Sequence, residues 1–100
     1  MNAKVEMKKV RDYLRHQRKL IDNDPHLADI RGKLTFRIEG WNARYHSIQI
    51  VVRNEDVPRT PYNSCGTRYL WVNSWSVSWK WQLARVLNEL CWHIREGNNS

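Results

Sequence analysis

The chain has little of what breaks regular structure or cross-links it. Only four glycines and three prolines occur among its 100 residues, which leaves little room for flexible linkers. The glycines stand singly, at positions 32, 40, 66 and 97, and this excludes a glycine-rich phosphate-binding loop. The two cysteines, Cys65 and Cys91, are too few for a disulfide framework and are expected to be reduced thiols.

Long apolar runs are also missing. No stretch approaches the roughly 18 apolar residues that a membrane-spanning helix needs, and the first residues contain no secretory hydrophobic region. Together with the reduced cysteines, these features predict a cytoplasmic protein. A chain of this length, residues 1–100, is expected to form one domain with a single modest core.

Acidic residues are scarce relative to basic ones. Ten Asp and Glu against 17 Lys and Arg give a net charge of +7. Residues 3–20 hold seven basic side chains and two acidic ones, a net of +5. Apolar side chains at helical spacing over 3–21 predict a basic amphipathic helix at the domain surface, which would attract phosphate, anionic lipid or an acidic protein patch. The residues of this helix assigned to nucleic-acid binding are Lys8, Arg11, Arg15, Arg18 and Lys19.

Hydrophobic periodicity predicts the element order α-(short α)-β-β-β-α. Asp24-Pro25 is a typical helix start, and it indicates a short helix over 25–31. Alternating aliphatic residues over 33–53 indicate a β-hairpin with its turn at Gly40 to Ala43. A loop over 54–67, a third strand over 67–74 and a helix over 77–96 follow. The expected fold is α+β: a three-stranded antiparallel sheet packed on the C-terminal helix, with the N-terminal helix alongside.

One face of this sheet is expected to remain open. If Leu70 and Val72 point inward, strand alternation turns Tyr69 and Trp71 outward. Rings on such a face can stack on bases. The residues outside the first helix that are assigned to nucleic-acid binding are Arg37, Tyr45 and Arg53. Direct binding of DNA or RNA through the basic helix and this face is one of two functional hypotheses.

Tryptophan is abundant, with six residues in a chain whose core is too small to bury them all. Trp79 and Trp81 differ by about 200° of helical rotation, so if one points inward the other faces out. Exposed aromatic surface usually marks a binding partner. The leading hypothesis is therefore a non-enzymatic modulator or inhibitor that binds a larger protein. The residues assigned to this contact are Trp41, Pro58, Arg59, Pro61, Tyr62, Trp75, Trp81 and Trp92.

The loop over 54–67 is long for so small a domain, and loops of this length are often functional. Its two X-Pro bonds, at Pro58 and Pro61, can exchange slowly between cis and trans. The loop is therefore a candidate contact with a partner, including a prolyl isomerase that acts at Pro58 or Pro61. The alternative is a disordered connection.

No combination of residues predicts catalysis or metal binding. The four histidines are spread over different predicted segments: His16, His26, His46 and His93. Cys91 and His93 stand two apart on a helix and do not share a face, whereas structural zinc needs four converging ligands. An enzyme that uses Cys65 or His46 has only the presence of these residues in its favour. The sequence therefore predicts no enzyme, no metal and no cofactor.

The element order resembles in outline that of the double-stranded-RNA-binding domain. That family opens its second helix with a lysine-rich segment that clamps phosphates, whereas the matching stretch SVSWKWQLAR offers only Lys80 and Arg85. Three strands followed by a helix are also loosely similar to phage-integrase arm-binding domains, which read DNA with the sheet. In general type, the small, basic and Trp-rich chain is similar to accessory proteins of temperate phages, which implies a host recombination or nuclease enzyme as partner.

Overall fold

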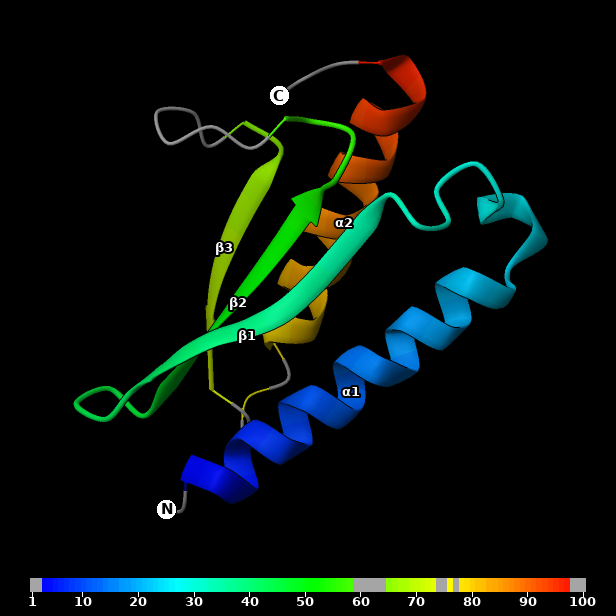
Figure 1. Cartoon of the computed structure of the whole chain (residues 1–100). Coiled ribbons are helices and arrows are strands. Elements are labelled where there is room, and N and C mark those ends of the chain that lie inside the picture. Colours follow the sequence, from blue (N-terminus) through cyan, green and yellow to red (C-terminus); the bar gives the residue numbers. More distant parts are fainter. Residues whose placement is uncertain (1–2, 59–64, 74–75, 77, 98–100) are drawn as a thin grey trace.

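A computed structural model describes residues 3–58, 65–73, 76 and 78–97 of the chain. Its elements are the helix α1 (Ala3–Asn23), the 3-10 helix η1 (Pro25–Leu27), the strands β1 (Leu34–Asn42), β2 (Ser47–Asn54) and β3 (Thr67–Val72), and the helix α2 (Ser78–Glu96) (Figure 1). This order confirms the predicted α-β-β-β-α fold. Four residues assigned to protein binding lie outside the described residues: Arg59, Pro61, Tyr62 and Trp75.

The segment between α1 and β1 differs from the helix predicted over 25–31. Only Pro25–Leu27 is helical, and it forms a 3-10 turn. Asp24 caps this turn as expected, because its Oδ1 accepts a hydrogen bond from the backbone N of His26 at 2.9 Å. Beyond it, the Ile30 N donates to the Leu27 carbonyl at 3.0 Å. The same carbonyl also accepts from the Arg31 N at 3.1 Å, so the chain continues here in hydrogen-bonded turns and not in a regular helix.

The three strands form one antiparallel sheet, as predicted, and their order in it is β1-β2-β3. Ile50 in the central strand β2 pairs with Ile38 of β1 and with Leu70 of β3. A β-bulge between Ile38 and Gly40 then shifts the register of β1 against β2. Because the bulge adds a residue to β1, the strand continues through Trp41, where the sequence predicted the turn.

The β1–β2 turn occupies residues 43–46, so its predicted place at 40–43 was wrong. Asn42 organises the turn, because its Oδ1 accepts hydrogen bonds from the backbone N of Arg44 at 3.0 Å and of Tyr45 at 3.4 Å. His46 ends the turn with a φ of 48°, in the left-handed region. The turn therefore carries the exposed ring of Tyr45 beyond the end of the sheet.

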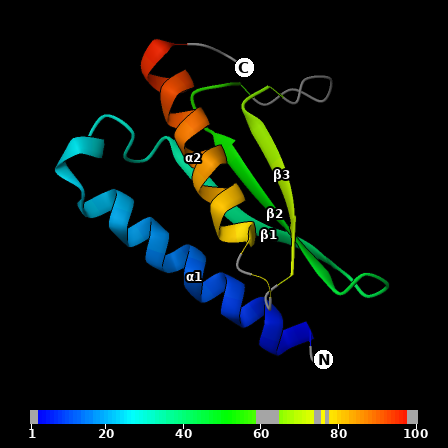
Figure 2. The same cartoon turned by 180° about the vertical axis from the view of Figure 1, so that it is seen from behind.

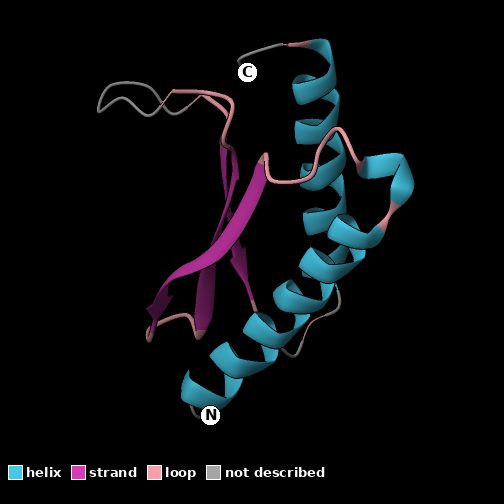
Figure 3. Ribbon diagram, turned by 45° about the vertical axis from the view of Figure 1, so that its right-hand side comes forward, coloured by secondary structure: helices cyan, strands magenta, loops and turns pink. Residues whose placement is uncertain are grey.

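Both helices cover the same face of the sheet, seen obliquely in Figure 3 and from behind in Figure 2. α1 lies against β1, whereas α2 lies against β2 and β3. The two helices meet where the rings of Tyr13 and Trp79 pack edge to face, with centroids 4.9 Å apart. Among the described residues, the opposite face of the sheet carries no helix.

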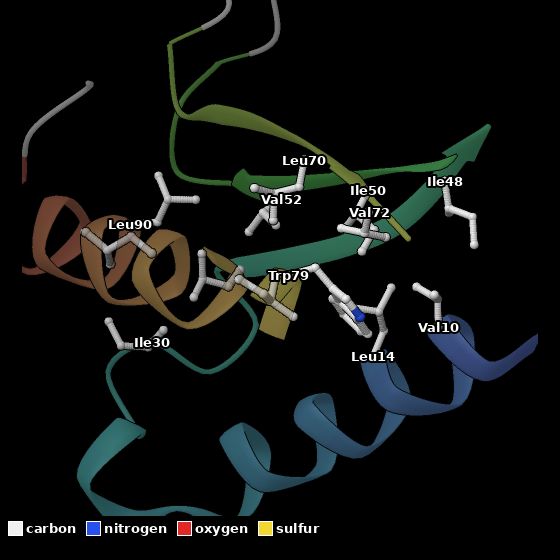
Figure 4. Close-up of a cluster of buried hydrophobic side chains, with 13 residues drawn as sticks. Val10, Leu14, Ile30, Ile48, Ile50, Val52, Leu70, Val72, Trp79 and Leu90 are labelled. Atoms are coloured by element: carbon white, nitrogen blue, oxygen red, sulfur yellow. The ribbon is translucent and has the colours of Figure 1, made fainter. Parts of the chain in front are cut away.

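The hydrophobic core lies between the sheet and the helices (Figure 4). α1 contributes Val10 and Leu14, which stand one turn apart as its apolar stripe predicted. Alternate residues of β2 point to the same core, and Trp79 enters it from the start of α2. Fully burying one such side chain stabilises the fold by roughly 1.5–3 kcal/mol. The core therefore fixes which side of each element remains available for binding.

Several ion pairs among the described residues join segments that are distant in sequence. The Nε of Arg95 on α2 lies 2.8 Å from Oδ2 of Asp29, and the Nη2 of Arg68 on β3 lies 2.7 Å from Oε1 of Glu89. Hydrogen bonds from these arginines lower the pKa of both carboxyls below their ordinary values. Both carboxylates are thus better stabilised in the folded chain than in the unfolded one.

Acid is therefore expected to remove the stabilisation that these pairs provide. A carboxyl with a lowered folded pKa stabilises the fold above its unfolded pKa, near 3.8 for Asp29 and 4.5 for Glu89, and the effect is lost as the pH falls through the folded value. The variant with Asp29→Asn and Glu89→Gln should melt at a lower temperature than the wild type at pH 7. That difference should shrink at pH 2, as measured by circular dichroism. An equal difference at both pH values would contradict the assignment.

Candidate functional site

A groove rich in arginine runs between α1 and β1. It has a volume of about 420 Å³. Its floor is apolar because α1 and β1 both turn apolar side chains toward the core at this point. Arg11, Arg15 and Arg18 follow at i, i+4 and i+7 along one side of α1, and Arg37 joins them from β1. The full lining is Met7, Arg11, Leu14, Arg15, Arg18, Phe36, Arg37 and Ile38.

Two of the four arginines have a carboxylate near them. The guanidinium carbon of Arg18 stands 4.8 Å from the ring centroid of Phe36, and its Nη1 is 4.0 Å from Oδ1 of Asp22. Arg37 donates from Nε to Oε2 of Glu39 at 3.0 Å. The contact with Phe36 holds Arg18 along the groove floor. The pair between Arg37 and Glu39 is exposed, and exposed pairs are worth at most about 1 kcal/mol, so an incoming anion can compete for Arg37.

The other two arginines, Arg11 and Arg15, are exposed, and neither forms an ion pair with a carboxylate of the described residues. Asp12 follows Arg11 in the sequence, but its carboxylate lies 2.8 Å from the Nζ of Lys8 and pairs with that residue. The hydrogen bond from Lys8 and the charges of Arg15 and Arg11 lower the pKa of Asp12. The groove therefore keeps a positive charge that the chain does not neutralise.

This basic surface continues toward the N-terminus of α1. A smaller depression of about 370 Å³ adjoins the groove and shares Met7, Arg11 and Arg15 with it. Lys8 lines this depression, whereas Lys19 is exposed on α1 but lines neither hollow. Of the eight residues assigned to nucleic acid, the structure thus brings together Lys8, Arg11, Arg15, Arg18 and Arg37.

The open face of the sheet lies around the edge of β1 from the groove. Arg37, Val51 and Tyr69 form one row across the three strands, and Gln49 pairs with Trp71 in the next. Tyr69 is 55% exposed and Trp71 is 53% exposed, so the expected outward orientation of both rings is confirmed. Val51 is only 6% exposed, which means that neighbouring side chains lie across it. The face therefore presents rings and polar groups, with its one central aliphatic residue covered.

Arg53, which was assigned to nucleic-acid binding on this face, does not belong to the open surface. Its Nη1 donates to Oγ1 of Thr67 at 2.8 Å, and its Nη2 donates to the carbonyl of Val57. The Nε stands 3.7 Å from Oε2 of Glu55. Strand alternation does point Arg53 to the open side, but the chain after β2 folds back and leaves the residue only 7% exposed. Arg53 links the end of β2 to β3 and to the following loop.

The fold-back around Arg53 depends on a glycine. Gly66 has a φ of +77°, which L side chains rarely adopt. A Cβ placed on it would stand 2.8 Å from Cγ2 of Val57. The loop over 54–67, predicted as a contact element, is therefore tightly packed where it starts and ends, and Pro58 within it is exposed.

The aromatic residues assigned to protein binding that the structure describes divide into two groups. Trp41 is half-buried in β1 and packs against the core, because the bulge moves it out of the turn where the sequence placed it. Trp81 is 77% exposed and Trp92 is 55% exposed on α2, while Trp79 is buried in the core. The expectation that Trp79 and Trp81 face opposite ways is confirmed. Trp81 and Trp92 remain available to a partner.

A second, mainly apolar groove of about 520 Å³ lies between the C-terminal half of α1 and α2. Leu20 and Trp92 stand at its sides and are exposed, and Leu87 and Cys91 line it. Burial raises the pKa of the Cys91 thiol, although the charge of Arg95 acts in the opposite direction, and no histidine lines the groove. Among the described residues, no three His, Cys, Asp or Glu side chains gather where they could hold a metal ion.

Sequence reasoning found the charged residues of the arginine groove but not the groove itself. Its apolar floor, including Phe36 and Ile38, was taken only as core. Glu39, which accepts a hydrogen bond from Arg37, was given no role from the sequence. The helical spacing of the arginines was a usable signal, but the placement of α1 against β1 could not be read from the spacing.

Comparison with known proteins adds no assignment. No family model matches the chain, and neither a curated protein nor a solved structure matches it. In the part of the chain that the structure describes, no helix is both long and apolar enough to span a membrane. Any functional assignment therefore depends on the geometry of the described residues.

Proposed function

We propose that the protein binds nucleic acid in the cytoplasm, through the groove between α1 and β1 and the sheet face next to it. The observation that carries this proposal is the convergence of four arginines from two elements on one groove, two of them without a carboxylate partner. Arginine presents a planar fork of donors that matches phosphate oxygens. The net charge of +7 adds a long-range attraction for a polyanion.

The apolar floor strengthens the case for a phosphate-rich ligand. Met7, Leu14, Phe36 and Ile38 form an apolar wall beside the arginines, and charges at a low-dielectric wall interact more strongly. The row of arginines follows the axis of α1, so successive groups can meet successive phosphates. This arrangement favours a chain of phosphates over a single compact anion.

Affinity that falls steeply with salt is the expected signature. Three or four neutralised phosphates predict a slope of log K against log salt of about −2 to −4, because each contact releases counterions. Fluorescence anisotropy of a labelled 20-nucleotide DNA strand, titrated with protein between 50 and 300 mM NaCl, measures this slope. Affinity that is absent at 50 mM NaCl, or that does not change with salt, would contradict the proposal.

We also propose a second function, contact with a larger protein through α2, because one specific observation favours it. Leu20 and Trp92 are exposed at the apolar groove between the two helices, and Trp81 is exposed elsewhere on α2. Trp is enriched among residues that dominate binding energy. On this proposal the protein modulates a partner that itself processes nucleic acid, and α2 contacts the partner.

The two functions use different surfaces, which makes them separable. Co-purification of one defined partner from nuclease-treated host lysate should be lost with Trp81→Ala and Trp92→Ala together. It should survive Trp71→Ala, which removes an equally large ring from the open sheet face. Two results would count against the protein contact. Either the partner no longer co-purifies after nuclease treatment, or it co-purifies equally well when Trp81, Trp92 and Trp71 are changed.

A further inference from the structure

We propose that the nucleic acid bound by this protein is single-stranded, and that its bases stack on Tyr69 and Trp71 while its backbone lies along the arginine groove. This inference depends on the proposed nucleic-acid function and adds the class of ligand to it. It starts from the two rings. They stand two residues apart on β3, so they point to the same side of the sheet, and each is more than half exposed.

The surroundings of the rings suit a base better than an apolar surface. Across from Trp71 stands Gln49, whose amide can donate to and accept from a base edge. Across from Tyr69 stands Val51, whose side chain is already covered. A sheet face that packs on another protein's core would offer rows of aliphatic side chains. This face instead combines two rings with polar neighbours, which is typical of single-strand binding platforms.

The charged side chain of Arg37 connects the sheet face that carries Tyr69 and Trp71 to the arginine groove. Arg37 lines the groove and also begins the row that crosses Val51 to Tyr69. Since neighbouring strands lie about 4.8 Å apart, Arg37 and Tyr69 are roughly 10 Å apart across the sheet. A short extended strand can span this distance, with a phosphate at Arg37 and a base on Tyr69. The backbone would then pass around the edge of β1, from Arg11 and Arg15 to the sheet face.

A duplex cannot use the same surface. Its bases already stack on one another, so a ring can reach a base face only after the stack is opened, which costs free energy. Its grooves are read by an inserted helix or ribbon, but Tyr69 and Trp71 lie on a broad sheet face. The exposed rings therefore discriminate in favour of unpaired bases.

The test compares a labelled dT20 strand with a labelled blunt 20-base-pair duplex by fluorescence anisotropy at 100 mM NaCl. Wild-type protein should bind dT20 at least about tenfold more tightly than the duplex. Changing both Tyr69 and Trp71 to Ala should weaken dT20 binding at least about tenfold, because each stacked base contributes about 5- to 150-fold. Duplex binding should change less than about twofold.

Two control proteins make the outcome specific. Changing Trp81 and Trp92 to Ala removes two rings from α2 that are at least as exposed as Tyr69 and Trp71, and should leave dT20 affinity unchanged. Changing Tyr69 and Trp71 to Phe keeps a ring at each position and should retain most of the affinity. Equal losses from the two alanine pairs would overturn the stacking role.

The possible failures can be told apart. Equal or tighter binding of the duplex, or no loss from Tyr69→Ala with Trp71→Ala, would overturn the single-strand inference and leave the nucleic-acid function standing. Failure to bind either probe in a salt-dependent way would overturn both. If changing Trp71 abolished binding of a protein partner but not binding of dT20, the sheet face would be a protein-docking surface. That result would also overturn the inference.

Discussion

Replacing Arg11 and Arg15 by glutamate is expected to weaken binding of a single DNA strand at least about 100-fold at 100 mM NaCl. These two guanidinium groups line the groove and have no carboxylate partner among the described residues, so they meet phosphate without giving up an internal contact. A hydrogen bond to a charged group is worth about 1.5–3 kcal/mol, and each 1.4 kcal/mol is tenfold in affinity. Anisotropy titration of labelled dT20 measures the loss.

Net charge alone could mimic this effect, so the control must change charge equally. Arg31→Glu with Arg85→Glu alters the formal charge by the same amount, at exposed residues that do not line the groove. This pair should weaken binding less than about fivefold. The glutamate pair adds negative charge to α1 and could disturb folding. Arg11→Gln with Arg15→Gln adds no negative charge and should still lose most of the affinity for dT20. Equal losses from the groove pair and the control pair would mean that the groove is not the site.

Replacing Arg53 by Ala is expected to lower the free energy of unfolding by about 3 kcal/mol, since each hydrogen bond to a charged group contributes about 1.5–3 kcal/mol. Arg53 is buried, and the change removes its donors to Oγ1 of Thr67 and to the carbonyl of Val57. Urea unfolding followed by circular dichroism measures the change. The folded fraction of the variant should bind dT20 as tightly as the wild type does.

Arg37→Ala is expected to lower the affinity for dT20 and to leave the free energy of unfolding almost unchanged. Arg37 is exposed, and its pair with Glu39 lies at the surface, so stability should change by less than about 1 kcal/mol. Its dT20 affinity should fall at least about fivefold, because Arg37 connects the groove to the sheet face. The two arginines were assigned the same role from their alternation in the strands. If Arg53→Ala lost binding without losing stability, the structural role given to Arg53 would be wrong.

The fold could be predicted from the sequence because its signals are local. Alternation over β1 and β2 and the apolar stripe of α1 each depend on neighbouring residues, and both are confirmed. The turn at 40–43 was misplaced because a bulge is a property of two paired strands, which one strand's alternation does not reveal. The same limit applies to Trp41, which the bulge moves from a turn into the sheet.

Only part of the candidate site could be predicted from the sequence, for a related reason. Spacing placed Arg11, Arg15 and Arg18 on one side of a helix, and that part needed no tertiary information. The position of Arg37 beside them depends on how α1 lies against β1, which is set by the packing of the core. The burial of Arg53 depends on the fold-back of the chain toward Gly66, so a correct alternation still gave the wrong environment.

The most direct test of the central claim is to locate the ligand on the protein by NMR. Titration of ¹⁵N-labelled protein with dT20 should shift the backbone amides around Arg11, Arg15 and Arg37 and the indole Nε1–H of Trp71. The buried indole of Trp79 and the exposed indole of Trp92 serve as internal references and should not shift. Shifts confined to α2, or a spectrum that dT20 leaves unchanged, would contradict nucleic-acid binding at the groove between α1 and β1.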